Sequence, residues 1–230
     1  MSASFDNLSI TFDLDGTLVD TAHDLVHVLN LVIKQDGLKN VNFNQARLMI
    51  SHGSMAMIKW AYIDADRPLT QGKAFKLQKE FLRIYFLNLT KYSKPYPGVP
   101  EILSQLKRSG ARLSICTNKP GFMARPLLTQ LGLAQFFDRI IGSDDGVRSK
   151  PAPDHIFTAV GHRKAQTIVM VGDDMPDALA AKAAKVPFIL CSYGYTQRGI
   201  YTFGADAVLR NFRELPSTLK GILGRAPCIS

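Results

Sequence analysis

The sequence predicts an α/β fold, a parallel-sheet core with a small α-helical cap inserted after the first strand. Strand-like and helical patterns alternate beyond residue 94, which is typical of a parallel sheet covered by helices on both faces. Residues 43–90 instead show helical apolar spacing and no clear strand. The stretch "KPYPGVPE", residues 94–101, is rich in proline and indicates a boundary. We therefore expect a core domain of residues 1–18 and 93–230 and a helical cap domain of residues 19–92.

Composition narrows the class of protein. The 230 residues are 46% hydrophobic, enough for one sizeable core with a smaller second lobe. The net charge of +9 suits anionic partners, but Lys and Arg are dispersed, without a zinc-finger spacing or a basic helix with interleaved aromatics. A small anion is therefore a better expected partner than nucleic acid.

The sequence also gives an expectation for the cellular location of the protein. No apolar run approaches the roughly 18 residues of a membrane helix, and the N-terminus shows no secretory signal pattern. The three cysteines, Cys116, Cys191 and Cys228, are far apart and form no C-x-x-C pair. Reduced thiols in a cytoplasmic protein without a membrane partner are the expected state.

The first elements are a strand and a helix. Leu8, Ile10 and Phe12 form an apolar run that predicts a strand over residues 8–13. Apolar residues at helical spacing then predict a helix over residues 21–35, and the glycine at position 37 marks its end. The apolar stretches around residues 55–61 and 75–89 indicate further helices in the cap.

The core elements follow the boundary. Pro100 suits the first turn of a helix that ends near Arg108, with Gly110 just past it. Downstream patterns predict strands over 112–116, 139–141, 167–171, 187–191 and 205–209, and helices near 123–131, 154–160, 177–184 and 212–223.

Four polar signals follow predicted strands or lie on loops at one edge of the sheet. They are Asp13, Asp15 and Thr17 in "DLDGT", Thr117 to Lys119 in "TNK", Lys150 in "RSKPAPD", and Asp173, Asp174 and Asp177 in "GDDMPD". Each has a plain structural alternative: an Asp-Gly turn, a helix N-cap, a solvent-facing lysine, or acids at a helix start. Because open parallel sheets bind ligands at the carboxyl ends of their strands, the four signals together favour a functional site.

Taken in order, these signals resemble the four motifs of the haloacid-dehalogenase-type phosphohydrolases, D-x-D-G-T, a Ser/Thr after a strand, a downstream Lys, and G-D-x-x-x-D, across nearly the full chain. "PYPGV", "TNKP" and "KPAPD" are similar to the phosphoglycolate phosphatase group. The resemblance implies a Rossmann-like core with a small helical cap. It also implies Mg²⁺-dependent hydrolysis of a small phosphate monoester, with 2-phosphoglycolate as the expected substrate, through an aspartyl-phosphate.

The resemblance also implies a role for each residue of the motifs. Asp13 is the expected nucleophile and a metal ligand, and Asp15 gives its backbone carbonyl to the metal and its side chain as general acid and base. Asp173 is the expected direct metal ligand and Asp177 holds a metal-bound water. The expected phosphate contacts are the Thr117 hydroxyl, the Lys150 ammonium and backbone N–H groups near Gly16 and Asn118. The role of Asp174 stays open.

Substrate choice is expected to lie in the cap. "ISHGSMAM", residues 50–57, stands where related caps carry a specificity loop, so Gly53 and Ser54 are candidate substrate contacts. The alternative is a plain helix start with Ser51 as its N-cap. The roles of His52 and His23 stay open, although an exposed position is the simpler expectation for His23.

Other functions stay open at this point. Within the family they are a pyrophosphatase, a nucleotidase, or a sugar-phosphate phosphatase or mutase. Outside catalysis, the alternative is a phosphate- or protein-binding module, which the presence of Asp13, Asp15, Lys150 and Asp173 disfavours. The expected partner is a small phosphorylated metabolite, and the chain is expected to be a monomer or a homodimer.

Overall fold

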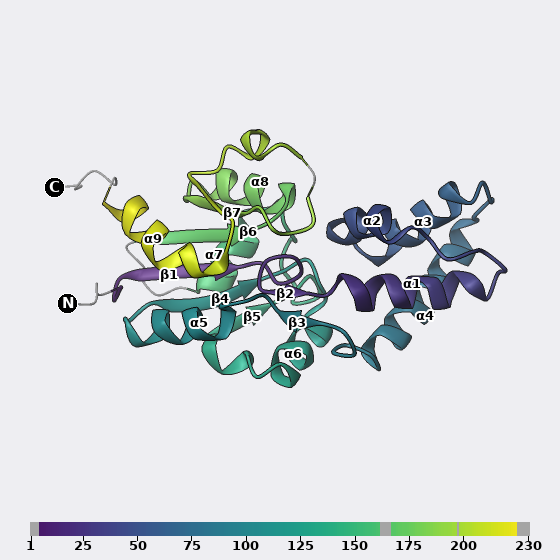
Figure 1. Cartoon of the computed structure of the whole chain (residues 1–230), viewed down its shortest axis with the longest axis horizontal. Coiled ribbons are helices and arrows are strands. Elements are labelled where there is room, and N and C mark those ends of the chain that lie inside the picture. Colours follow the sequence, from purple (N-terminus) through teal and green to yellow (C-terminus); the bar gives the residue numbers. More distant parts are fainter. Residues whose placement is uncertain (1–4, 162–166, 197, 225–230) are drawn as a thin grey trace. The chain divides into compact units, whose positions relative to one another are not determined.

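The computed structural model describes residues 5–161, 167–196 and 198–224. The chain divides into two compact units, one of Met1–Val19 with Pro95–Ser230 and one of Asp20–Lys94 (Figure 1). We call these the core unit and the cap unit. Two short strands, β2 (Val19–Asp20) and β3 (Lys94–Pro95), pair with each other where the chain passes between the units.

The core unit is built on a parallel six-stranded sheet with the strand order β5-β4-β1-β6-β7-β8. Its strands are β1 (Leu8–Phe12), β4 (Arg112–Cys116), β5 (Arg139–Ile141), β6 (Thr167–Gly172), β7 (Phe188–Cys191) and β8 (Ala207–Leu209). Its helices are α5 (Val99–Arg108), α6 (Gly121–Gln130), α7 (Asp154–Val160), α8 (Met175–Ala184) and α9 (Leu215–Leu223). The predicted fold class is therefore confirmed.

One face of this sheet is apolar apart from Thr167, which pairs with Leu8 at the start of β6. The apolar residues of the central strands on this face are at most 2% exposed: Leu8, Ile10, Phe12, Leu113, Ile115, Val169, Val171 and Ile189. The ring of Phe12 lies 6.0 Å from that of Phe212, which precedes α9. Burying each such side chain contributes about 1.5–3 kcal/mol, so this face carries much of the stability of the core unit.

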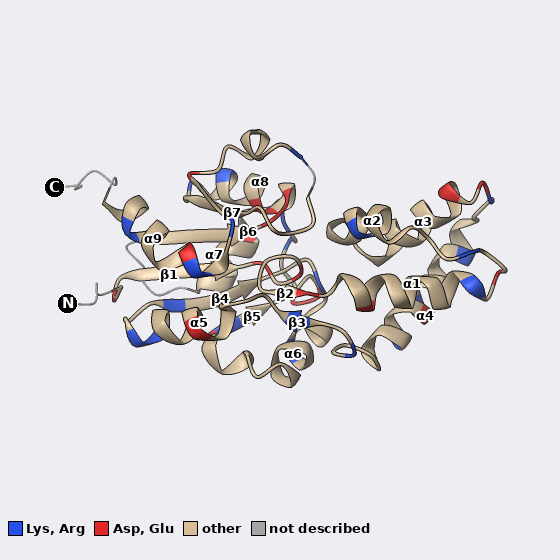
Figure 2. Ribbon diagram, in the orientation of Figure 1, with Lys and Arg blue, Asp and Glu red and all other residues tan. Residues whose placement is uncertain are grey.

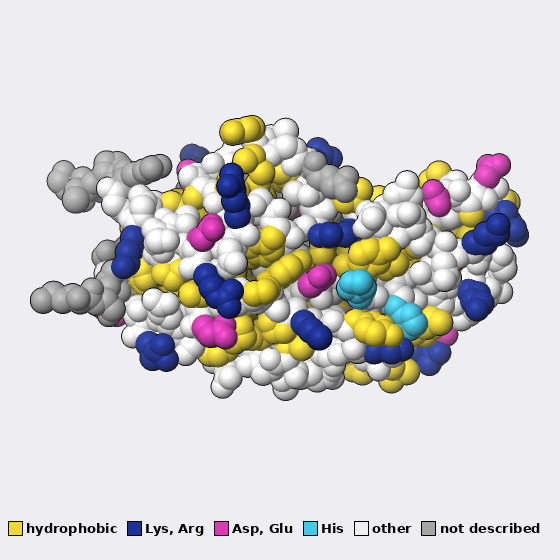
Figure 3. Space-filling view, viewed as in Figure 1, with side chains coloured by type: hydrophobic (Ala, Val, Ile, Leu, Met, Phe, Trp, Pro, Cys, Tyr) yellow, Lys and Arg dark blue, Asp and Glu magenta, His cyan; other side chains and the backbone are white. Residues whose placement is uncertain are grey.

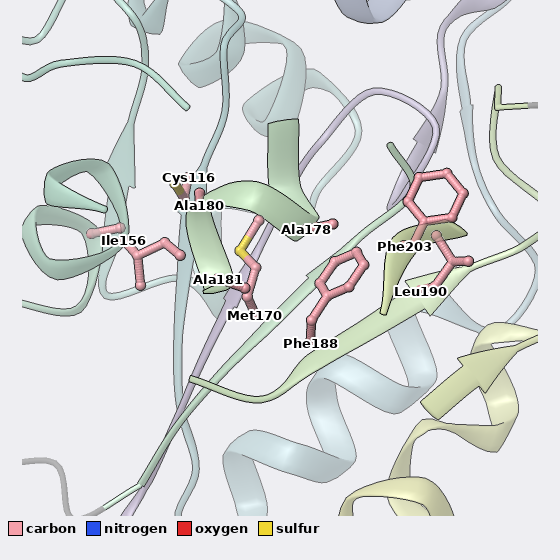
Figure 4. Close-up of a cluster of buried hydrophobic side chains, with 10 residues drawn as sticks. Cys116, Ile156, Met170, Ala178, Ala180, Ala181, Phe188, Leu190 and Phe203 are labelled. Atoms are coloured by element: carbon pink, nitrogen blue, oxygen red, sulfur yellow. The ribbon is translucent and has the colours of Figure 1, made fainter. Parts of the chain in front are cut away.

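The opposite face, which helices α7 and α8 cover, is mixed. Figure 4 shows its apolar part, where Met170 and Phe188 pack beneath the small residues Ala178 and Ala181 of α8 and beside Ile156 of α7. Alanines let the helix approach the sheet closely. The same face also bears the buried hydroxyl residues Ser9, Thr11 and Ser114, in register on β1 and β4.

Element ends differ from the expectations where capping decides them. Helix α8 begins at Met175, two residues before the predicted start, because Asp174 is its N-cap. The last predicted helix opens as a separate 3₁₀ turn, Phe212–Glu214, before α9 begins at Leu215. The strand expected over 205–209 is shorter, Ala207–Leu209.

The cap unit is helical. It contains α1 (Ala22–Lys34), α2 (Phe43–Ala46), a 3₁₀ helix (Arg47–His52), α3 (Ser54–Asp64) and α4 (Gln71–Phe86). The buried Asp24 carboxylate accepts hydrogen bonds from the backbone N–H groups of Tyr92 and Ser93, at 2.8–3.1 Å, and from the Ser93 hydroxyl at 2.6 Å. This network joins the first helix of the unit to its last residues.

The expected alternative of Ser51 as a helix N-cap is wrong. Ser51 lies inside the 3₁₀ helix, and α3 begins at Ser54 with Gly53 as its N-cap. Gly53 has φ +84°, and nothing within 4 Å would meet an added Cβ. The glycine is therefore required by the backbone conformation rather than by space. The side chain of His23 is exposed and stacks on Phe43 at 4.5 Å.

Charged residues are spread over the described chain. Lys and Arg occur on elements of both units (Figure 2), and on the face in Figure 3 they are scattered among other side chains rather than joined into one patch. Cys116 and Cys191 are free and buried in strands, and burial raises the pKa of Cys116 to about 12. Cys228 lies outside the described residues. None of the described helices has the length and apolarity needed to cross a membrane.

Candidate active site

Asp13 and Asp15 lie directly beyond β1. The Asp13 N–H donates to the Val171 carbonyl at 2.9 Å, which fixes the chain beside β6. Leu14 between them is fully buried, whereas the Asp13 and Asp15 side chains are each 16% exposed. Gly16 turns the backbone with φ +84°. The stretch is therefore both a tight turn and the place where two carboxylates reach the surface of the core.

Three carboxylates from two strand ends form a cluster. One oxygen each of Asp13, Asp173 and Asp177 lies within 4.8 Å of the others. The Thr17 hydroxyl donates to one oxygen of Asp173 at 2.8 Å, and the Tyr195 N–H donates to the other at 2.9 Å. The Asp173 carboxylate is therefore held in one orientation.

Lys150, the first residue of "KPAPD", contacts two carboxylates of this cluster. Its buried Nζ lies 2.9 Å from Asp13 Oδ1 and 2.6 Å from Asp177 Oδ1. The Lys150 backbone is fixed at both ends, since its carbonyl accepts from Asn118 Nδ2 at 3.0 Å and its N–H donates to His155 Nδ1 at 3.2 Å. Burial opposes the charged lysine, but the two carboxylates outweigh burial and raise its pKa.

Asp177 and Asp174 form a capping box at the start of α8. Asp177 Oδ2 accepts from the N–H groups of Asp173 and Asp174, each at 3.1 Å. Burial raises the pKa of Asp177 to about 6, although Lys150 opposes the rise. Asp174 accepts from the Met175 N–H at 2.7 Å. Asp174 thus caps the helix that carries Asp177.

The "TNK" residues follow β4. The Thr117 N–H donates to the Ile141 carbonyl at 3.1 Å, and its hydroxyl oxygen accepts from the Lys119 N–H at 3.2 Å. That arrangement leaves the Thr117 hydroxyl hydrogen for a ligand oxygen. Lys119 Nζ lies 3.0 Å from both oxygens of Asp15, and its side chain is only 4% exposed. Lys119 is therefore a site residue that the sequence analysis did not assign.

The residues fit a divalent cation. Asp13, Asp15, Asp173 and Asp177 carry four negative charges when ionised, against the two positive charges of Lys119 and Lys150. Burial and the neighbouring carboxylates hold the pKa of Asp173 well above its usual range, so a positive charge is needed to keep it ionised. Mg²⁺ prefers such oxygen donors.

Two glycines leave the space that Asp173 occupies. A Cβ on Gly16 or on Gly194 would come within 2.3 Å of an Asp173 side-chain atom. Gly194 is another residue that the sequence analysis missed. Because its contribution is the absence of a side chain beside Asp173, only the folded structure reveals it.

Gly194→Ala is expected to weaken Mg²⁺ binding by about 10–100-fold, the usual range for disturbing the support of a metal ligand. The added methyl group displaces the Asp173 carboxylate. The rise in Tm on adding Mg²⁺ measures the affinity. Gly221→Ala is the matched control, because nothing within 4 Å would meet its Cβ. Equal Mg²⁺ affinity in the two variants would contradict the prediction.

His155 is expected to make stability fall in acid. Burial, with help from Lys150, lowers the pKa of His155 to about 4, from 6.5 in the unfolded chain. Between these values the unfolded state binds more protons, so His155 contributes stability that is present above about pH 6.5 and is lost by up to about 3 kcal/mol towards pH 4. Urea unfolding of wild type and His155→Asn across this window tests it, and the same pH dependence in both would refute it.

Residues 10–191 match the family model of the haloacid dehalogenase-like hydrolases, and the chain belongs to this family. It is 39% identical over 221 residues to a phosphoglycolate phosphatase of Caulobacter vibrioides, covering 95% of this chain and 93% of that relative. A phosphoglycolate phosphatase of Agrobacterium fabrum is 37% identical over 210 residues, 90% of each chain. The solved structure of a predicted phosphoglycolate phosphatase from Haemophilus somnus has a TM-score of 0.84 at 30% identity, covering 91% of this chain and 96% of that one. The predicted family is thus confirmed.

Not every candidate residue belongs to this cluster of the core unit. Asp13, Asp15, Thr117, Asn118, Lys150, Asp173 and Asp177 are joined by the contacts above. Gly53 and Ser54 belong to the cap unit, where Gln78 Nε2 donates to the Ser54 hydroxyl at 3.3 Å. Their contact with substrate stays a prediction.

Proposed function

We propose that this protein is a Mg²⁺-dependent phosphatase that hydrolyses 2-phosphoglycolate through an aspartyl-phosphate on Asp13. The observation that carries the proposal is the position of Asp13, whose carboxylate lies 2.9 Å from the Lys150 ammonium and within 4.8 Å of carboxylate oxygens of Asp173 and Asp177. A phosphate monoester dianion repels a carboxylate, so this arrangement needs positive charge to bring the two together. The names of the relatives support the choice of substrate.

In the first step, a carboxylate oxygen of Asp13 attacks the phosphorus atom. The bond from phosphorus to the ester oxygen breaks, and its electron pair goes to the leaving alkoxide. Asp15 in its protonated form gives its proton to that alkoxide. Thr117 donates its hydroxyl hydrogen to a phosphoryl oxygen, and Lys150 offsets the negative charge beside Asp13.

In the second step, the Asp15 carboxylate takes a proton from water as the water oxygen attacks the phosphorus of the aspartyl-phosphate. The bond between phosphorus and Asp13 breaks, which releases inorganic phosphate and restores the Asp13 carboxylate. Lys119, at 3.0 Å from both oxygens of Asp15, acts as a positioning residue by holding that carboxylate between the two proton transfers.

The residues that would hold Mg²⁺ are Asp13, Asp173 and the backbone carbonyl of Asp15, with Asp177 binding through water. When bound, the ion supplies positive charge that offsets the repulsion between nucleophile and phosphate. Backbone N–H groups near Gly16 and Asn118 would complete the phosphate contacts, although the N–H of Gly16 itself donates to the Val19 carbonyl at 2.9 Å. Gly53 and Ser54 are the proposed contacts to the rest of the substrate.

Activity is expected to require Mg²⁺ and to favour 2-phosphoglycolate in a panel of phosphate monoesters, pyrophosphate and nucleotides. Phosphate release is measured with Mg²⁺, with EDTA, and after Mg²⁺ is restored. Chelation should abolish hydrolysis and restored Mg²⁺ should recover it. A strong preference for pyrophosphate or a sugar phosphate would refute the substrate, and full activity in EDTA would refute the metal requirement.

A further inference from the structure

The core unit has a cavity at the amino end of its sheet. Its volume is about 400 Å³, and it is lined by the first residues of β1, β4 and β5 and by the end of α7. Ser9 on β1 lies four residues before Asp13, which is about 13 Å of strand. The cavity is therefore separate from the carboxylate cluster, which lies beyond the other end of the same strands.

The lining of this cavity is polar because of strand register. Ser9 pairs with Arg112, and Ser114 pairs with Arg139, so these four side chains share the face of the sheet that α7 covers. Ser9 and Ser114 are buried, at 3% and 6% exposure. The faces of a parallel sheet are usually continuous apolar surfaces, and the opposite face of this sheet follows that rule apart from Thr167. The packing of α7 on the sheet therefore does not by itself explain why these four polar side chains are on this face.

Two guanidinium groups give the cavity its charge. Neither Arg112 nor Arg139 forms an ion pair with another residue in the described part of the chain. The Arg139 side chain lies close to the end of α7, since a Cβ on Gly161 would be 2.8 Å from its Nη1. Asp138 also lines the cavity, but its carboxylate is 2.7 Å from Lys107 Nζ. The lining thus retains an excess of positive charge.

We propose that this cavity binds a small phosphate-bearing anion at a site distinct from the active site. Two arginine forks and two serine hydroxyls are donors suited to phosphate oxygens. The volume lies within the range of about 300–1,000 Å³ found for small-molecule sites, so it accepts a phosphorylated metabolite. The ligand would contact β1 and β4, the two strands that Asp13 and Thr117 directly follow.

The test uses inorganic phosphate as the probe and backbone amide NMR of the full-length chain in EDTA, with ionic strength held constant by NaCl. The amide signals of Arg112, Ser114, Arg139 and Gly161 are expected to shift along one saturation curve. Phosphate binding at the active site is followed separately through the amides of Gly16 and Thr117. The two sites, and hence this proposal and the proposed function, are distinguished in one titration.

The double variant Arg112→Gln/Arg139→Gln is expected to raise the Kd of the cavity for phosphate at least about tenfold, because it removes two charged donors, which bind an anion more strongly than neutral donors do. The active-site signals should titrate as in wild type. Lys182→Gln/Lys220→Gln, at two exposed lysines, is the control with the same change in charge. If the double variant does not fold, Arg139→Gln alone replaces it, since Arg139 is exposed.

The proposal is overturned if millimolar phosphate shifts only the active-site amides. It is also overturned if the arginine variant and the lysine control bind phosphate at the cavity with equal affinity.

Discussion

Asp13→Asn is expected to lower kcat for 2-phosphoglycolate by at least about 10⁴-fold, the scale of losses when a catalytic nucleophile is removed. An amide at this position cannot form the aspartyl-phosphate. The protein should still fold, because Lys150 keeps its 2.6 Å contact with Asp177 and the Asp13 N–H keeps its hydrogen bond to Val171. The loss should therefore appear in activity and not in Tm.

The measurement is phosphate release in saturating Mg²⁺, together with intact-protein mass spectrometry after an acid quench during turnover. Wild type should show a population heavier by one phosphoryl group, and Asp13→Asn should show none. Asp64→Asn, at an exposed residue of α3, is the control for the loss of one negative charge. Undiminished activity in Asp13→Asn would mean that another group attacks the phosphorus.

The fold could be predicted because its strands and helices have recognisable patterns of apolar residues. Strands in a parallel sheet that is buried on both faces read as short apolar runs, and amphipathic helices separate them. The ends of the elements were less predictable. Helix α8 starts at Met175 rather than at Asp177 because a carboxylate caps it, and "DDMPD" permits a start at either aspartate.

The residues of the candidate site likewise fall into those that the sequence predicts and those that it does not. Asp13, Lys150 and Asp173 could be predicted from the sequence, because each belongs to a recognisable motif and acts through its side chain. Tyr195 was not, because it holds Asp173 through a backbone N–H that any residue except proline could supply. Gly194 was missed because its part is to leave space. Of the residues missed, only Lys119 carried a usable signal, since it stands with Thr117 in "TNK" directly after β4.

Lys150 is expected to stabilise the fold in addition to its proposed contact with phosphate, a role that its motif does not predict. Lys150→Met is expected to lower the free energy of unfolding by about 3–5 kcal/mol at pH 7 in EDTA, the usual cost of leaving one member of a buried ion pair without its partner. The change leaves Asp13, Asp173 and Asp177 within 4.8 Å of one another without the ammonium group that lies 2.9 Å from one and 2.6 Å from another.

The pH dependence of this loss identifies its cause. Without Lys150, the pKa of Asp177 should rise further above its value in the unfolded chain, because the lysine opposes the effect of burial. The folded state of the variant then binds more protons than the unfolded state between those two pKa values, so its stability falls as pH rises through that window. The difference from wild type should therefore shrink from pH 7 towards pH 4.

Urea unfolding at pH 7, 5.5 and 4.5 measures the difference. Lys182→Met, at an exposed lysine of α8, is the matched control. The double variant Lys150→Met/Asp177→Asn should recover part of the stability at pH 7, because the amide oxygen can still accept the two backbone hydrogen bonds at the start of α8 while one buried charge is removed. A loss that is the same at every pH and is not relieved by Asp177→Asn would indicate lost packing rather than uncompensated charge, and would refute the electrostatic role assigned to Lys150.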